Sequence, residues 1–253
     1  MTVTRDSAKE SAEWVRRFHP APHPRARLVC FPHAGGSASY FFAVSRALAP
    51  SIEVICLQYP GRQDRRSEPC LDSVSALASS VTSALGPWTD LPLLFFGHSL
   101  GASVAYETAR LLQADGVAVA GLYASGRRGP TTVRDERVHQ RPDDGLLAEL
   151  RRLSGTDGAV LGDHEIVRMI LPALRADYRA AETYRFAPGE TLRCPITVLT
   201  GDSDPKVTVD EARDWESHTS GPFSLKVYPG GHFFLQDHQQ DILATISRDA
   251  ANL

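Results

Sequence analysis

The sequence has no long apolar run. No window approaches the roughly 18 consecutive apolar residues that a membrane-spanning helix needs. The N-terminal stretch MTVTRDSAKESAEWVRR is polar, and the apolar centre of a secretory signal is missing from it. The formal net charge is only −3, which gives no overall basic field to hold nucleic acid or an anionic membrane. We therefore expect neither a membrane nor a nucleic acid as partner.

Cysteine is scarce, and no two cysteines form a CxxC pair. The four are Cys30, Cys56, Cys70 and Cys194. Three of them lie in or beside apolar runs, where cysteine behaves as a small core residue. This favours buried free thiols over disulfides or a zinc site, and hence a reducing, cytoplasmic compartment.

Short strand patterns alternate with helical patterns along a chain of 253 residues, 42% of them hydrophobic. Buried strands are predicted at 27–31, 52–57, 91–96, 119–124, 196–200 and 223–228. Helices are predicted at 39–49, 74–85, 101–114, 209–218 and 239–250. The alternation predicts an α/β fold with a mostly parallel sheet, flanked by helices, whose chemistry lies at the carboxyl ends of the strands.

One stretch, 127–193, contains no convincing strand. It holds two helical patterns instead, at 144–154 and 163–184. The apolar positions are Leu146, Leu147, Leu150 and Leu153 in the first, and Ile166, Ile170, Leu174 and Tyr178 in the second. Pro172 should kink the second helix, and GTDG at 155–158 is a candidate hinge. We expect one α/β core formed by 1–126 and 194–253, with 127–193 inserted as a helical lid; ordinary crossover helices are the other interpretation.

The most specific motif is Gly97-His98-Ser99-Leu100-Gly101, a GxSxG pattern between an apolar strand and a helix. A serine on such a sharp turn has a strained backbone that lifts its hydroxyl into the cleft. Glycines two residues to either side avoid collisions with the neighbouring strand and helix. Ser99 is therefore the candidate nucleophile, and His98 is interpreted as a packing residue.

The base should follow the last strand, because the chain order in this architecture is serine, acid, histidine. His232 leaves that strand in a glycine-rich loop, Pro229-Gly230-Gly231-His232, and is the candidate general base. His238, further along, is the weaker alternative.

The acid that orients the base should follow the preceding strand, in Gly201-Asp202-Ser203-Asp204-Pro205. Asp204 is the candidate, because it lies deeper in the loop and precedes a proline that fixes the backbone. Asp202 is more typical of a turn residue. An acid after strand 119–124, such as Asp135, is a third possibility.

Two backbone N–H groups should stabilise the oxyanion. One belongs to Leu100, the residue after the nucleophile, and the other comes from the loop after the first strand, 32–38. We assign the second donor to Ala34, with Gly35 as the alternative. The same loop matches neither the GxGxxG spacing of dinucleotide sites nor the GK[ST] ending of phosphate loops.

Together the runs LVCFPHAGGSASYF, QYPGRQDRRSEP, GHSLGASVAYE, GDSDP and GGHFF resemble the type II thioesterases of polyketide and non-ribosomal peptide assembly lines. The resemblance spans about 14–246. It implies the α/β-hydrolase fold, with 1–126 and 194–253 as its core. It also implies a free-standing editing enzyme of antibiotic biosynthesis, which removes aberrant acyl groups from the phosphopantetheine arm of an acyl or peptidyl carrier protein. It also implies the triad Ser99, Asp204 and His232, the donors Ala34 and Leu100, and a mobile lid. No metal or dissociable cofactor is implied, since the pantetheine arrives with the carrier.

Carrier proteins are usually acidic, so a basic rim is expected around the cleft. The candidate arginines are Arg62, Arg65, Arg66, Arg127 and Arg128. Other functions remain open at this point. A small-molecule carboxylesterase or lipase, or an acyltransferase, would use the same triad, and a binding module could keep the fold without catalysis.

Overall fold

The computed structural model describes residues 11–153 and 163–253. These residues form a seven-stranded sheet with the order β1-β3-β2-β4-β5-β6-β7. The strands are β1 Val15–Arg16, β2 Ala26–Phe31, β3 Ile52–Leu57, β4 Leu93–His98, β5 Val119–Ser125, β6 Ile196–Gly201 and β7 Phe223–Tyr228. All neighbours pair in parallel except β1, which runs antiparallel to β3. The expected mostly parallel α/β fold is confirmed.

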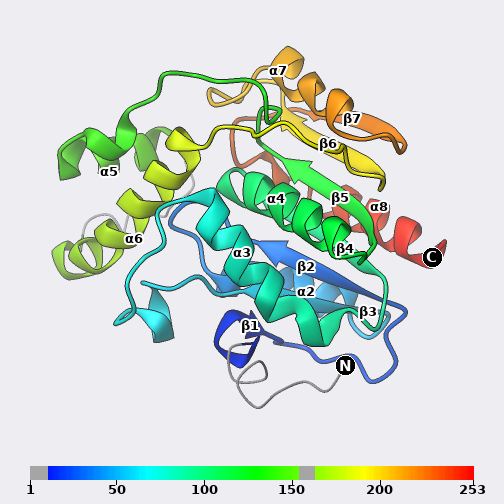
Figure 1. Ribbon diagram of the computed structural model, residues 1–253. Coiled ribbons are helices and arrows are strands. Elements are labelled where there is room, and N and C mark those ends of the chain that lie inside the picture. The colour runs from blue at the N-terminus through cyan, green and yellow to red at the C-terminus, as the bar shows by residue number, and fades with distance from the viewer. Residues whose placement is uncertain (1–10, 154–162) are drawn as a thin grey trace.

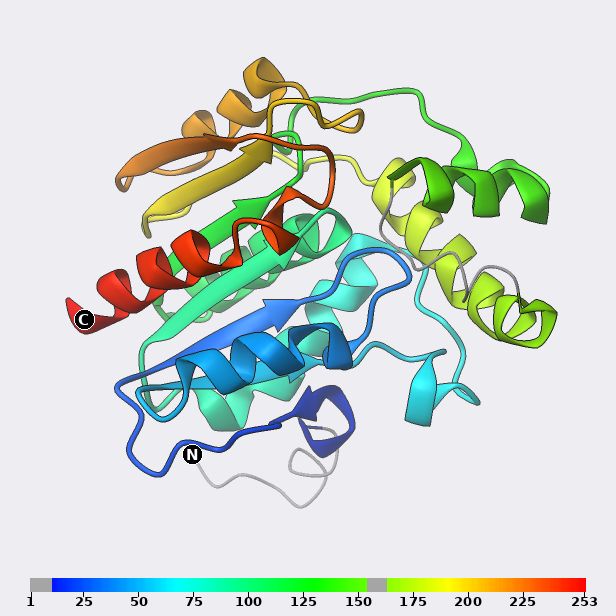
Figure 2. The ribbon, with the colours of Figure 1, turned by 180° about the vertical axis from the view of Figure 1, so that it is seen from behind.

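Helices cover both faces of this sheet. Their bounds are α2 Phe42–Leu48, α3 Val74–Leu85, α4 Leu100–Ala114, α7 Val209–Arg213 and α8 Gln239–Ala251. α3 and α4 lie on one face (Figure 1), and α2 and α8 lie on the other (Figure 2). Two of the predicted helices are shorter than expected, because each is joined to a 3₁₀ turn, Ala38–Phe41 before α2 and Asp214–His218 after α7.

The segment between β5 and β6 contains α5 Asp143–Leu153 and α6 His164–Thr183, which lie beyond the carboxyl ends of the strands (Figure 1). The four leucines expected on one side of α5 are buried. In α6 the buried side is shifted, because Val167, Leu174 and Tyr178 are buried while Ile166 is only partly covered. The helix continues through Pro172. The hinge expected at 155–158 lies outside the described residues, and the lid role stays a prediction.

The apolar interior fits the composition. One core cluster packs between the sheet and α3 and α4, and a second packs between the sheet and α2 and α8. The four cysteines are free thiols, three of them buried and Cys70 partly buried. Among the described residues, no helix is both long enough and apolar enough to cross a membrane.

Candidate active site

Ser99 lies at the turn between β4 and α4 with φ 53° and ψ −116°, a conformation that residues with a side chain rarely adopt. Its neighbours leave no room for side chains. A Cβ on Gly97 would lie 2.3 Å from the carbonyl oxygen of Gly101, and one on Gly101 would lie 2.1 Å from that of Phe31. The glycines at both motif positions therefore have the steric cause that the sequence suggested.

His232 and Asp204 come from the loops after β7 and β6 and meet in a buried pair. The imidazole Nδ1 lies 2.9 Å from Oδ2 and 3.1 Å from Oδ1 of Asp204. The backbone N–H of Lys206 also donates to Oδ1, at 2.8 Å. These bonds hold the carboxylate still and place the Nδ1 proton toward it, which leaves Nε2 free to accept a proton.

One cavity brings Ser99 and His232 together with Ala34, Phe233 and several residues of the 127–193 segment. Among the described residues no hydrogen bond joins the Ser99 hydroxyl to Nε2 of His232. Catalytic hydrogen bonds of this kind often tighten only when substrate binds. The cavity therefore holds a serine and a carboxylate-oriented histidine in an arrangement suited to acyl transfer.

The alternative acids and base have other partners. Asp202 accepts the Gly230 N–H at 3.0 Å, and this bond lowers its pKa, as the Ser203 hydroxyl does to a smaller extent. Asp135 is exposed and pairs with Arg137. The Nε2 of His238 lies 2.9 Å from the carbonyl oxygen of Pro229. Within the described residues, none of the three lines the cavity at Ser99.

The two candidate oxyanion donors lie beside Ser99. Leu100 is the first residue of α4, so its N–H belongs to the group that has no partner within the helix. Ala34 lines the cavity. The N–H of Gly35 is engaged elsewhere, because it donates to Oδ2 of Asp177 at 2.8 Å. This engagement favours Ala34 over Gly35 as the second donor.

Two further histidines pack behind the site. The His98 ring is fully buried, lies 4.9 Å from that of His232 and has Nδ1 3.0 Å from the Ser125 hydroxyl. His33 packs edge-on against Phe233 and Tyr40. Burial, followed by the charge of His232, lowers the pKa of both rings, to about 3 for His33. Both are neutral near pH 7 and act as packing residues.

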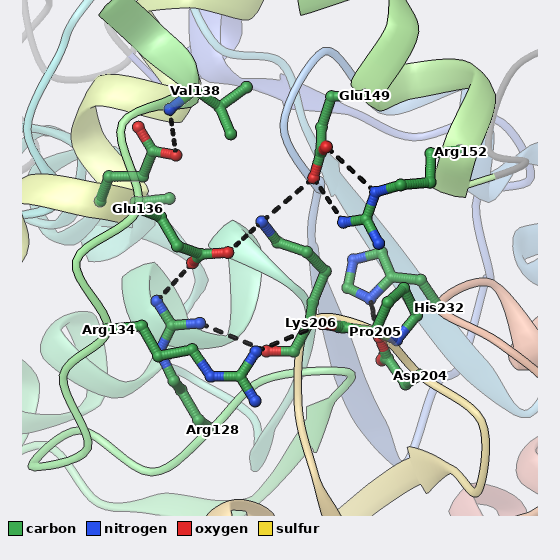
Figure 3. Close-up of polar contacts among 12 residues, drawn as sticks. Arg128, Arg134, Glu136, Val138, Glu149, Arg152, Asp204, Pro205, Lys206 and His232 are labelled. Carbon is green, nitrogen blue, oxygen red and sulfur yellow. Dashed lines mark hydrogen bonds and ion pairs between the residues drawn. The ribbon is translucent and has the colours of Figure 1, made fainter.

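A charged network surrounds the loop that holds Asp204 (Figure 3). The Lys206 ammonium contacts Glu136 and lies 3.4 Å from Glu149 of α5. Arg128 pairs with Glu136 at 2.8 Å and donates to the Lys206 carbonyl at 3.3 Å. Burial opposes ionisation of Glu136, but Lys206 and Arg128 lower its pKa to about 2. Sequence reasoning missed Lys206; the available signal was a lysine, one of only three in the chain, directly after Asp204-Pro205.

The expected basic rim needs correction. Arg62, Arg65 and Arg128 are buried and paired with Asp177, Glu68 and Glu136. Arg127 is only partly exposed, and its guanidinium donates to the hydroxyl of Ser103 and the carbonyl of Ala181. A guanidinium that is already paired inside the protein cannot dock an acidic partner. Of the five candidates only Arg66 is exposed.

Known proteins share this architecture. The family model described as "Thioesterase domain" matches residues 26–250. The chain belongs to the thioesterase family. It is 58% identical to Thioesterase PikA5 of Streptomyces venezuelae over 94% of this chain and 85% of that protein.

Solved structures agree with this assignment. The type II thioesterase BorB from the borrelidin biosynthetic cluster has a TM-score of 0.89 at 48% identity, over 94% of this chain and 97% of BorB. YbtT, the type II thioesterase from the yersiniabactin pathway, has a TM-score of 0.85 at 31% identity, over 94% of this chain and 98% of YbtT. The resemblance seen in the sequence is thus confirmed: this protein is a type II thioesterase.

Proposed function

We propose that this thioesterase edits polyketide or non-ribosomal peptide biosynthesis by hydrolysing acyl thioesters on the phosphopantetheine arm of an acyl or peptidyl carrier protein. The observation that supports the chemistry most directly is the cavity in which Ser99 lies beside His232, itself bound to Asp204. Membership of the thioesterase family supports the substrate class.

The reaction begins when the Ser99 hydroxyl attacks the thioester carbonyl while Nε2 of His232 takes its proton. The N–H groups of Leu100 and Ala34 hold the oxyanion, and one such donor is typically worth about 3–4 kcal/mol of transition-state stabilisation. Asp204 keeps the imidazole in the required tautomer and stabilises its positive charge. The pantetheine thiol then leaves with the proton from His232.

Water completes the cycle. His232 takes a proton from water, the hydroxide attacks the acyl-serine, and the carboxylic acid is released as Ser99 regains its proton. These steps use only side chains and backbone groups of this chain together with water. The segment 127–193 would act as the lid over the acyl group, since Leu150, Leu153 and Tyr178 line the cavity. The free thiols support a cytoplasmic location.

The test is to incubate the protein with acetyl-loaded carrier protein and to follow the intact mass of the carrier over time. Loss of the acetyl group with the wild type, and not with Ser99→Ala, is the expected result. A carrier that stays acylated with both proteins contradicts short-chain editing. Longer acyl chains and free esters then separate a different chain preference from a carboxylesterase.

Two further outcomes separate the remaining functions. Transfer of the acetyl group to a small nucleophile other than water would indicate an acyltransferase. Failure of a fluorophosphonate probe to label Ser99 would indicate a binding protein without catalysis.

A further inference from the structure

A buried ion pair joins the loop after β3 to α6. The guanidinium of Arg62 contacts both carboxylate oxygens of Asp177, with Nη1 2.6 Å from Oδ2 and Nη2 2.9 Å from Oδ1. The side chain of Asp177 is 0% exposed and that of Arg62 is 7% exposed. Replacing such a pair by apolar residues often costs nothing, so its presence calls for a role besides stability.

The pair also contacts the loop that contains Ala34. Oδ2 of Asp177 accepts the N–H of Gly35 at 2.8 Å, and Nη1 of Arg62 donates to the carbonyl of Gly36 at 3.2 Å. The loop itself is closed by the Gly36 N–H, which donates to the carbonyl of His33 at 2.9 Å. That carbonyl and the Ala34 N–H belong to one planar peptide unit, so fixing one orients the other.

Helix α6 lies directly on this loop. A Cβ on Gly35, where φ is +75°, would lie 2.8 Å from the Cδ1 of Leu174, one turn before Asp177. The loop and α6 are therefore in direct contact at this point, and the positive φ favours glycine there. A shift of α6 would therefore move the Arg62–Asp177 pair, and with it the direction of the Ala34 N–H.

We propose that Arg62 and Asp177 are positioning residues that orient the Ala34 N–H toward the oxyanion. Through this pair, the direction of the N–H depends on how α6 packs against the loop. This inference rests on the proposed function, because it takes Ala34 as an oxyanion donor. Among the described residues that line the cavity at Ser99, neither Arg62 nor Asp177 is found. Their effect is expected in the transition state, where the oxyanion forms, and not in substrate binding.

The test compares Asp177→Ala and Asp177→Asn with a control on the same helix. Asparagine keeps an oxygen that can accept the Gly35 N–H, whereas alanine keeps none. Arg179→Ala is the control, since Arg179 pairs with Asp72 at 2.9 Å through side chains that are at least half exposed, away from the loop. Each variant is first compared with the wild type by circular dichroism and thermal unfolding.

Two readouts are measured on the folded variants: kcat and KM for a short acyl-pantetheine thioester, and the rate at which a fluorophosphonate labels Ser99. Deleting an oxyanion donor costs about 10²–10³ in kcat, so a displaced donor should cost no more than the lower end of that range. We expect kcat to fall about 100-fold for Asp177→Ala and about tenfold for Asp177→Asn, with KM within about twofold of wild type. The labelling rate should fall in the same order, and Arg179→Ala should change neither readout.

Three results would overturn the proposal. One is an Asp177→Ala variant that folds and keeps wild-type kcat and labelling rate. Another is a loss in Asp177→Asn that appears in KM and not in kcat. The third applies if Asp177→Ala does not fold: Asp177→Asn and Arg62→Lys that fold with unchanged kcat would assign the pair to stability alone. If the wild type is labelled but does not hydrolyse the thioester, the proposed function fails while the labelling rates still test the pair.

Discussion

Two aspartates stand two residues apart after β6, and their surroundings assign them different roles. Asp204 is buried and shares its carboxylate between His232 and the Lys206 N–H. Asp202 is exposed and accepts the N–H of Gly230, which lies two residues before His232 in the same loop. One carboxylate therefore acts on the imidazole, and the other holds the backbone of the histidine loop.

Asp204→Asn should separate these roles. An amide in place of the carboxylate favours the wrong imidazole tautomer and cannot stabilise the imidazolium, so kcat should fall by about 10³–10⁴ while the protein still folds. Asp202→Asn is the matched control, because its amide oxygen can still accept the Gly230 N–H, and kcat should stay within a few-fold of wild type. Steady-state hydrolysis of an acyl-pantetheine thioester measures both. Equal losses in the two variants would contradict the assignment of Asp204.

At the scale of elements, α5 is connected to the loop of Asp204 by charge. Lys206 contacts Glu136 in the connection before α5 and Glu149 within α5 (Figure 3). Glu149 also pairs with Arg152 at 2.7 Å. Because the backbone of Lys206 binds Asp204 while its ammonium binds the inserted segment, one residue couples the acid loop to the helix over the cavity.

Lys206→Met should loosen α5 while leaving the sheet intact. Glu149 is buried and Glu136 is partly buried; both lose the cation that they share, although Arg152 and Arg128 remain as their partners. Loss of one charged hydrogen-bond partner costs about 1–3 kcal/mol. Amide hydrogen exchange within α5 should therefore become faster, whereas exchange within α3 should not change. Arg193→Ala removes an exposed pair with Glu190 and should alter neither helix. Unchanged exchange in α5 of the methionine variant would show that its apolar contacts alone hold it.

Most of the helices and strands could be predicted from the local pattern of apolar and polar residues. The predicted strands 52–57 and 223–228 have the bounds of β3 and β7, because each is a short run of β-branched and aromatic residues between turn residues. β1 was not predicted. It has only two residues, which pair with β3 alone, and two residues are too few to show an alternation of apolar and polar side chains. The loops of the candidate residues Ser99, Asp204 and His232 could be located because each follows a strand directly, which is a local property.

At the scale of the whole molecule, what the sequence could not show is pairing over long distances. Arg62 and Asp177 are 115 positions apart, and Lys206 and Glu136 are 70 apart. An arginine on a predicted loop is expected to be exposed to solvent when its partner is unknown. For this reason Arg62 was wrongly included among the arginines expected to dock a carrier protein. A buried charge is recognised only once the fold brings its partner to it.

The acid sensitivity of the whole protein should depend on the buried neutral histidines. Burial lowers the pKa of His33 to about 3, from 6.5 for an ordinary histidine. The unfolded chain therefore binds a proton as the pH falls through 6.5, while the folded protein binds it only near 3. Stability is lost across this window, by about 2 kcal/mol between pH 7 and pH 5 for His33 alone. Burial is also the main cause that lowers the pKa of His98, so this ring adds to the loss of stability at low pH.

His33→Phe should flatten this dependence. Phenylalanine keeps an aromatic ring between Tyr40 and Phe233 and has no proton to bind, so the change in unfolding free energy from pH 7 to pH 5 should shrink by about 2 kcal/mol. Urea unfolding at both pH values measures it. His23→Gln, at an exposed position, should leave the wild-type slope unchanged. A His33→Phe protein that loses as much stability as the wild type over this range would show that other groups, the carboxylates first among them, cause the acid sensitivity.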